Sequence, residues 1–317
     1  PVTEQFTPGK KNAAPVHRSG VIAIIGPPNA GKSTLLNHFL GQKIAIVTPK
    51  PQTTRNRILG ILTGESYQII LLDTPGLHKP REMLNREMVR IALDTLAEAD
   101  VVLFLADAQI NKPEKLEKLG SEFAEYLQQA SCPVVLALNK VDQLEKPQLL
   151  PLMEWYADFY PFASVLPISA LHGDGTDVLV AELVRLLPEG PQYYPDDIPT
   201  DATERFIAAE IIREKVFLLT REEVPYSTAV MIDSFQESDG RKPVVIHATI
   251  LVEQPSQKGI IIGRKGQMLA EIRKKATPEI EEMLDQRVSL RLWVKVKKKW
   301  TTNEQILREL GLSKSLS

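Results

Sequence analysis

Cysteine is almost absent from this chain of 317 residues, which contains only Cys132. A single cysteine excludes an internal disulfide and a cysteine-rich zinc site, and the five histidines show no metal-ligand spacing. No apolar run approaches the ~20 residues that a membrane-spanning helix needs. With 43% hydrophobic and 25% charged residues, the composition is that of a globular protein rather than a disordered or collagen-like one. We therefore expect a cytoplasmic protein in a reducing compartment.

The net charge of −2 is small, but it is distributed unevenly along the chain. Residues 1–199 hold 18 basic and 23 acidic residues, whereas residues 200–317 hold 20 basic and 17 acidic residues. A basic C-terminal part on an acidic protein suggests a polyanionic partner for that part alone.

Length and composition indicate two domains, since roughly 150 residues per domain is typical. Residues 1–19 lack apolar periodicity and any targeting signal, so we expect a disordered tail. Four prolines in residues 188–201 indicate a linker. The linker separates a first domain at 20–187 from a second domain at 202–300, which leaves 301–317 as a C-terminal extension.

In the first domain, short apolar runs alternate with stretches of helical period. The predicted strands are Val21–Ile25, Tyr67–Leu72, Val101–Ala106, Val134–Leu138 and Val165–Ile168. Continuous apolar strands separated by helices indicate a mostly parallel sheet that is covered on both faces. The first domain is therefore predicted to be a doubly wound α/β domain.

The second domain has a different pattern. A helix is predicted over 202–219, with one apolar stripe made of Phe206, Ala209, Ile212, Val216 and Leu219. Further elements are predicted as strands near 226–235 and 244–252, helices near 267–274 and 278–284, and a strand over 288–297. The last strand alternates between an apolar face and a face with basic residues and Trp293. The order α-β-β-α-α-β describes a small α+β domain.

A phosphate-binding loop follows the first strand and leads into a helix predicted at Thr34–Leu40. The segment Gly26-Pro27-Pro28-Asn29-Ala30-Gly31-Lys32-Ser33 matches GxxxxGK[ST] in the strand–loop–helix context that this motif requires. Its backbone N–H groups can close on phosphate oxygens, its lysine can bridge the β- and γ-phosphates, and its serine can ligand Mg²⁺. The predicted nucleotide contacts here are Gly26, Asn29, Ala30, Gly31, Lys32, Ser33 and Thr34.

Three later segments indicate which nucleotide binds. Asp73 and Gly76 come after a strand, where the carboxylate can hold Mg²⁺ and the Gly76 amide can sense the γ-phosphate. Asn139-Lys140-Val141-Asp142 also follows a strand, and an aspartate there can accept from the N1–H and the amino group of guanine. Ser169 and Ala170 follow the last strand and can present a backbone N–H to the guanine carbonyl. The pattern predicts guanine rather than adenine.

These motifs resemble the translation-factor-like branch of GTPases, and the resemblance covers the whole first domain. It implies that Thr54, just before Arg55, is the switch threonine that ligands Mg²⁺ together with Ser33 and Asp73, although Thr53 remains an alternative. Lys32, Thr54 and Gly76 are then the catalytic candidates. Leu77 occupies the position where Ras-like enzymes have the glutamine that orients the attacking water, so unassisted hydrolysis should be slow.

In the second domain, Gly263-Arg264-Lys265-Gly266 precedes a helix and matches the GxxG loop of KH domains. Six basic residues lie between positions 258 and 275 with the single acid Glu271, and a solvated face usually mixes both signs. We therefore predict a type II KH domain that binds single-stranded RNA. Its candidate contacts are Lys258, Ile262, Gly263, Arg264, Lys265, Gly266, Arg273, Lys295 and Lys297.

Both domains, in this order and at this size, resemble the Era family of bacterial GTPases along nearly the entire chain. The resemblance implies hydrolysis of GTP to GDP with Mg²⁺. It also implies a KH domain that binds the 3′ end of 16S ribosomal RNA during small-subunit assembly and rRNA maturation. A cytoplasmic monomer with some peripheral contact to the inner membrane is implied as well. Ala30 replaces a valine that is common in the family, which is a conservative change.

Asn29 suggests a further cofactor, because in this branch an asparagine in the loop often accompanies a bound K⁺. A monovalent cation could neutralise charge between the β- and γ-phosphates, as an arginine finger does elsewhere. The alternative is that Asn29 only bonds its own loop. Two other functions also remain open from the residues alone. They are a GTPase in another process, such as RNA modification, and an RNA-binding module with a vestigial GTPase fold, which the intact motifs disfavour.

Overall fold

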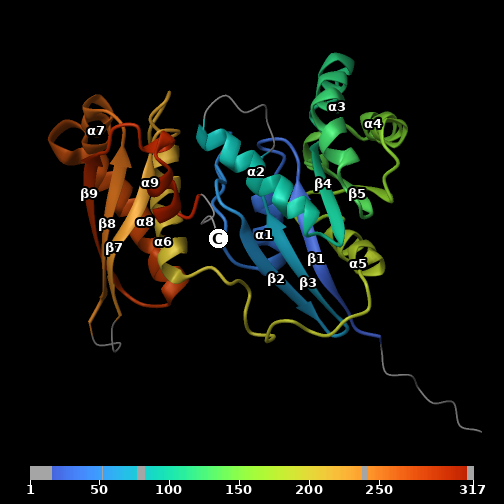
Figure 1. The fold of residues 1–317 in the computed structure, drawn as a ribbon, viewed down its shortest axis with the longest axis horizontal. Helices are drawn as coiled ribbons and strands as arrows, with labels where there is room; N and C mark the ends of the chain where they lie inside the picture. The colour runs from blue at the N-terminus through green and yellow to red at the C-terminus, as the bar shows by residue number, and fades with distance from the viewer. Residues whose placement is uncertain (1–15, 52, 77–82, 238–241, 313–317) are drawn as a thin grey trace, which may run out of the picture.

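The computed structural model describes residues 16–51, 53–76, 83–237 and 242–312. The chain forms two domains that lie side by side, each with its own sheet, and an extended segment without helix or strand connects them (Figure 1). Among the described helices, none is long and apolar enough to cross a lipid bilayer.

The first domain is built around a six-stranded sheet in the order β2-β3-β1-β4-β5-β6. Only β2 runs antiparallel to its neighbour β3, and the other described pairs are parallel. The strands are β1 Arg18–Ile25, β2 Ile58–Gly64, β3 Tyr67–Asp73, β4 Val101–Asp107, β5 Val134–Asn139 and β6 Ser164–Pro167. The sheet places the ends of β1, β3 and β5 along one edge, where loops can meet.

Helices cover both faces of this sheet, as predicted. Alternate residues of β1 enter opposite cores, since Ile22 and Ile24 pack in one apolar cluster and Ala23 and Ile25 in another. The helices are α1 Lys32–Leu40, α2 Met83–Ala97, α3 Pro113–Gln128, α4 Lys146–Phe159 and α5 Thr176–Leu186. The doubly wound α/β architecture is confirmed.

The structure differs from the prediction at two places in this domain. The strand β2 was not predicted, because its segment contains two glycines and neither alternates nor forms a continuous β-branched run. It lies at the sheet edge and gains its partner from β3. In addition, β1 begins at Arg18 and Ser19 is fully buried, so these two residues belong to the sheet rather than to the tail expected at 1–19. Residues 1–15 of that tail lie outside the described residues.

The second domain contains a three-stranded sheet in the order β7-β8-β9, with β7 and β8 antiparallel and β8 and β9 parallel. Its elements are α6 Glu204–Leu219, β7 Ala229–Gln236, β8 Val244–Val252, α7 Pro255–Ile262, α8 Gln267–Leu284 and β9 Val288–Val296. The predicted order α-β-β-α-α-β is confirmed, and so is the alternation in β9, where Val288, Leu290 and Val294 are buried.

The two middle helices differ from their predicted positions. The prediction placed both after the GxxG segment and broke them before Pro278, but α8 continues through this proline. Residues 274 and 278 are exposed, so water can replace the backbone hydrogen bond that the proline removes. The first of the two helices is instead α7, a short helix that begins at Pro255 with a capping box from Gln254 and Gln257.

Helix α6 is buried on more sides than the predicted single stripe. Its buried residues include the charged side chains of Glu210, Arg213, Glu214 and Lys215. The helix lies on the side of the second domain that faces the first domain (Figure 1). A helix between two domains has no fully solvated face, so its buried charges need partners, which are found both within the second domain and in the first.

The C-terminal extension is also part of the interface between the domains. Trp300 is fully buried and donates its indole N–H to the carbonyl of Ser227 at 2.9 Å. The helix α9 Glu304–Glu309 follows, and its Leu307 packs with Trp300 against Met88 of α2 in the first domain. Residues 300–312 therefore pack against both domains, whereas the sequence alone indicated only an extension beyond 300.

Candidate nucleotide-binding site

The loop between β1 and α1 has a backbone shape that requires its glycines. Gly26 and Gly31 have φ angles of 148° and 100°. A Cβ atom on Gly26 would lie 2.2 Å from the carbonyl oxygen of Leu105, and one on Gly31 would lie 2.2 Å from the side-chain nitrogen of Asn139. The loop wraps around the ammonium of Lys32, which donates to the carbonyls of Gly26 and Pro27 at 3.1 and 3.0 Å. A phosphate oxygen could take the place of these carbonyls.

Three side chains with oxygen atoms, from different segments, meet beside this loop. The Ser33 hydroxyl donates to Asp73 at 2.6 Å and lies 2.8 Å from the Thr54 hydroxyl. The other carboxylate oxygen of Asp73 is buried and has no hydrogen-bond partner. Hydroxyl and carboxylate oxygens suit Mg²⁺, so these residues fit the predicted metal. Thr53 instead donates to the carbonyl of Lys50 at 2.7 Å, which favours Thr54 over Thr53 as the switch ligand.

Burial disfavours the charged forms of both Lys32 and Asp73 in this site. It lowers the pKa of Lys32 to about 8, against the attraction of Asp73. It also raises the pKa of Asp73 to about 6, although Lys32 opposes the shift. Phosphate oxygens beside Lys32 and a cation beside Asp73 would compensate both burial costs. The electrostatics therefore favour a ligand that brings an anion and a cation together.

The segment predicted to bind guanine is bonded to the phosphate loop through Asn139. Its side-chain amide donates to the carbonyl of Ala30 at 2.7 Å, and its side-chain oxygen accepts from the N–H of Ala170 at 2.9 Å. Ser169 donates to the carboxylate of Asp142 and is the main cause that lowers the pKa of this carboxyl. The structure thus brings the two predicted base-binding segments together and fixes them relative to the loop.

One cleft of about 530 Å³ contains most of these groups. It is lined by the predicted residues Asn29, Gly31, Lys32, Ser33, Thr34, Thr54, Gly76 and Lys140. It is also lined by residues 46–49, which sequence reasoning did not identify because they carry no motif. Asn29 reaches this segment directly, since its side-chain amide donates to the carbonyl of Pro49 at 2.9 Å.

The GxxG loop connects α7 to α8. Gly263 has a φ of 71°, and a Cβ atom there would lie 2.6 Å from the Cβ of Met268, so this glycine is required by the turn. Gly266 has a φ of 79°, but a Cβ atom there would meet nothing within 4 Å. The side chains of Arg264 and Lys265 between them are exposed. The loop therefore offers an open backbone and two cations to an approaching polyanion.

The predicted RNA contacts do not all share one face. Lys258 lies on α7 and Arg273 on α8, in the same helical layer as the GxxG loop. In contrast, Lys295 alternates with the buried Val294 and lies on the opposite face of the sheet. Lys295 and Lys297 line a separate groove there.

Comparison with known proteins identifies both domains. A family model described as 50S ribosome-binding GTPase matches residues 21–140, and a KH-domain model matches residues 223–301. The GTPase Era of Geobacter metallireducens is 54% identical over 294 residues, which cover 93% of this chain and 97% of that protein. The chain belongs to the Era family of GTPases. The GTPase Era of Syntrophus aciditrophicus is 51% identical over 295 residues, with 93% and 95% coverage.

Two solved Era structures are similar over both domains. A variant of Aquifex aeolicus Era bound to GDP and AlF₄⁻ has a TM-score of 0.87 at 41% identity, and covers 94% of this chain and 100% of its own. An Era in complex with MgGDPNP and nucleotides 1506–1542 of 16S ribosomal RNA has a TM-score of 0.88 at the same identity and coverage. The predictions of a GTPase, of a guanine nucleotide and of a C-terminal KH domain are confirmed. The roles of individual residues stay predictions.

In this Era family member, the KH domain holds the segment between α1 and β2 that contains Thr54, the predicted switch threonine. We call its described residues, 43–51 and 53–57, the switch segment. Arg55 is buried and donates to the carbonyls of Thr228 and Tyr226, both at 2.7 Å. Its guanidinium also lies over the rings of Phe217 and Trp300, at 5.5 and 6.0 Å from their centroids. The residue directly after Thr54 is therefore inserted into the second domain.

Two charged residues of α6 reach the same segment. Arg213 donates to the carbonyl of Thr53 at 2.6 Å. The carboxylate of Glu214 accepts from the backbone N–H of Val47 at 3.0 Å and from the ammonium of Lys43 at 2.7 Å. These contacts explain why the charges of α6 can be buried. They could not be predicted, because the partners are more than 150 residues apart in the sequence.

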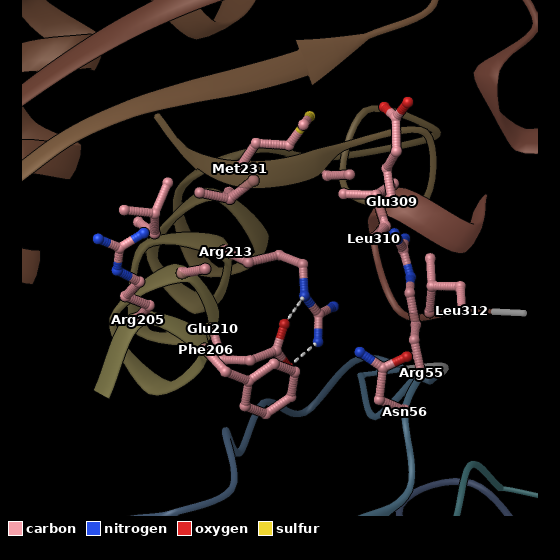
Figure 2. Close-up of a pocket in the computed structure, with 14 residues that line it drawn as sticks. Arg55, Asn56, Arg205, Phe206, Glu210, Arg213, Met231, Glu309, Leu310 and Leu312 are labelled. Carbon is pink, nitrogen blue, oxygen red and sulfur yellow. Dashed lines mark hydrogen bonds and ion pairs between the residues drawn. The ribbon is translucent and has the colours of Figure 1, made fainter. Parts of the chain in front are cut away.

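A cavity of about 240 Å³ remains between the two domains beside these contacts. Figure 2 shows Arg55 and Asn56 on one side of it and Arg213, bonded to Glu210, on the other. The Nη1 atom of Arg213 and the side-chain oxygen of Asn56 are buried without a hydrogen-bond partner. Buried polar groups without partners cost free energy, so this part of the interface is less stable than a fully bonded one.

We expect Asp142→Asn to exchange the guanine for the xanthine base. The substitution replaces an acceptor with a donor, so GTP affinity should fall by ~2–4 kcal/mol while xanthosine triphosphate becomes a ligand. Titration with both nucleotides measures the exchange, with Glu145→Gln on the exposed surface nearby as the control. Unchanged GTP affinity would remove Asp142 from the base site.

We expect Arg55→Ala to loosen the switch segment as well as the domain interface. The carbonyls of Thr228, Tyr226 and Pro225 lose their donor, so the free energy of unfolding should fall by about 2–4 kcal/mol. Affinity for GDPNP should fall more than affinity for GDP, because Thr54 is predicted to act on the metal next to the γ-phosphate.

Denaturant unfolding and nucleotide titration measure both effects. Arg57→Ala is the matched control, since Arg57 is exposed and pairs with Glu98 of its own domain. Equal losses for GDP and GDPNP would mean that Arg55 stabilises the fold without positioning the switch segment.

Proposed function

We propose that this chain hydrolyses GTP and binds the 3′ end of 16S ribosomal RNA during small-subunit assembly and rRNA maturation. The proposal rests above all on the likeness, over both domains, to an Era solved with MgGDPNP and nucleotides 1506–1542 of this RNA. Both halves that such a role needs are present in this chain. They are a cleft with the guanine-nucleotide motifs and an open GxxG loop with exposed cations.

In the nucleotide site, we assign the triphosphate to the loop at Gly26–Ser33. Lys32 exchanges the two neutral carbonyls of the loop for the β- and γ-phosphates. The phosphates give its ammonium group an anionic partner. Ser33, Thr54 and Asp73 would hold Mg²⁺, which supplies positive charge against the phosphate oxygens. Gly76 lines the same cleft, where its amide can contact the γ-phosphate.

Hydrolysis needs a substitute for the missing glutamine. Residue 77 is leucine and lies outside the described residues. Its side chain has no group that could orient water. Turnover should therefore be slow alone and should depend on a further activator, either K⁺ or the RNA and ribosomal surface.

We also propose, from the family resemblance, a cytoplasmic monomer with a peripheral fraction at the inner membrane.

Sequencing of RNA crosslinked to the protein in cells tests the main proposal, because the sequence does not define the RNA. Crosslinks should concentrate at the 3′ end of 16S ribosomal RNA. Crosslinks in large-subunit RNA would instead agree with the 50S ribosome-binding description of the first family model.

Changing Arg264 and Lys265 together to Glu should abolish RNA binding and leave GTP binding intact. Both side chains are exposed and far along the chain from the nucleotide motifs, so the change acts on the polyanion alone. Binding of a 16S 3′-end RNA over a series of salt concentrations measures the effect, and the parent should show a steep salt slope. A double variant that binds this RNA normally would assign the loop a structural role only.

We expect GTP turnover to be faster in K⁺ than in Na⁺ at equal ionic strength. Asn29 bonds the carbonyl of Pro49 rather than its own loop, so its side chain lies between the phosphate loop and neutral carbonyl oxygens of the switch segment. These are ligands that a monovalent cation can use. Asn29→Ala should erase the difference between the salts and retain GTP binding.

Because Asn29 has a φ of 64°, Asn29→Gly is the better-matched variant, since glycine adopts this angle without strain. GDP affinity in both salts serves as the control. Equal rates in K⁺ and Na⁺ would exclude the cation and leave RNA or the ribosome as the activator.

A further inference from the structure

The KH sheet has a second face that the GxxG loop does not use. On β9, the buried Leu290 and Val294 face the core that α6, α7 and α8 cover, so the residues between them face the other way. We call this side the outer face and define it by His247 and Thr249 of β8 and Arg291, Trp293 and Lys295 of β9. In the parallel pair, His247 lies opposite Arg291 and Thr249 lies opposite Trp293.

Trp293 is unusually exposed for its residue type. Its exposed fraction is 48%, whereas Trp300 of the same domain is completely buried. The His247 ring contacts it edge-on, with centroids 5.2 Å apart and an angle of 65° between the planes. A ring that is already held in place loses little conformational entropy when a partner stacks on it. The outer face therefore presents a pre-ordered aromatic surface to solvent.

Positive charge flanks this ring along the strand. Arg291 and Lys295 are two residues before and after Trp293, so all three point to the same side, and both charged side chains are exposed. An exposed aromatic ring between cations is the arrangement that single-stranded nucleic acid uses, with bases on the ring and phosphates on the cations.

A groove of about 180 Å³ lies between Thr249, which pairs with Trp293 across the strands, and Glu309 of α9. Lys295, Lys297 and Thr249 line it, together with the carboxylates of Asp233 and Glu309. Asp233 accepts a hydrogen bond from the Thr249 hydroxyl at 2.7 Å. Lysines beside carboxylates suit a nucleotide, which has anionic phosphates as well as N–H donors on its base edge.

The topology allows one RNA to reach both faces. β9 is the edge strand of the sheet, so no further described strand separates the helical side from the outer face. A GxxG loop clamps about four nucleotides. The RNA in the related Era complex spans nucleotides 1506–1542, which is much longer than one such clamp.

We propose that the outer face is a second RNA contact, in which Trp293 stacks on an unpaired base and Arg291 and Lys295 bind the adjacent phosphates. This inference rests on the proposed function, since it assumes that the chain binds RNA. It assigns the RNA a path from the GxxG loop around β9. The two sites would then act on one strand, so that the loop gives the first grip and the outer face extends it.

The test compares two RNAs on the full-length protein with GDPNP and Mg²⁺. One covers nucleotides 1506–1542 of 16S ribosomal RNA, and the other is a single-stranded segment of about five nucleotides that fills only the GxxG loop. Trp293→Ala should weaken the long RNA by roughly 5- to 100-fold, as expected for the loss of one stacked base, and leave the short RNA unchanged. Trp293→Phe should retain most of the affinity.

Leu218→Ala is the control, because Leu218 is another exposed apolar residue of this domain and lies on α6. Tryptophan fluorescence provides an independent readout, since the other two tryptophans are more buried than Trp293. The long RNA should quench the emission of the parent, and Trp293→Phe should remove this quenching. Unchanged melting temperatures would show that the variants are folded.

The outcomes separate the two proposals. If the parent binds neither RNA, the proposed function fails. If the parent binds the long RNA and Trp293→Ala binds it equally well, only the second contact is wrong. If Trp293→Ala binds free RNA normally but binds the small subunit more weakly, the outer face contacts a ribosomal protein, which also overturns the RNA assignment.

Discussion

The insertion of Arg55 into the KH domain is the contact on which the arrangement of this protein depends. A guanidinium can be buried only if its N–H groups find acceptors, and here every described acceptor is a carbonyl of the other domain. Because Thr54 directly precedes Arg55 and meets Ser33 at the predicted metal site, one short segment joins both domains to the nucleotide. Nucleotide binding at Thr54 and the contacts of Arg55 with the KH domain are therefore coupled, and the coupling acts in both directions.

The remaining interface combines two kinds of contact. Around α6 it is polar, with buried charges and an unfilled cavity that leaves the Nη1 atom of Arg213 without a partner. Around Trp300 it is apolar and includes Leu84 and Met88 of α2, the first helix described after Gly76. Polar contacts can be exchanged for water at little cost, whereas the apolar cluster cannot. Arg55, directly after Thr54, thus contacts the KH domain through polar bonds, whereas α2, the first helix described after Gly76, contacts it through apolar packing.

How much the sequence predicts depends on the range of each interaction. The phosphate loop, the Asp142 segment and the GxxG loop are local motifs in which neighbouring residues determine the backbone, and all three were recognised. The burial of α6 was not, because it comes from residues such as Lys43 and Thr53, which are far away in the sequence. The position of Lys295 shows the same limit, since the count of basic residues did not reveal that a strand places it on a separate face.

Helix α8 provides a physical link between the two sites. It begins at Gln267, directly after the GxxG loop, and its Glu279 accepts from Lys43 of the switch segment at 2.7 Å. Twelve residues of helix span about 18 Å, and a helix is stiff along its axis. RNA that shifts the N-terminus of α8 would therefore move Glu279 with it. Glu214 of α6 accepts from the same lysine, and Lys215 of α6 pairs with both carboxylates, so a shift of α8 alone would strain this network of four charged groups and favour a joint movement of both helices.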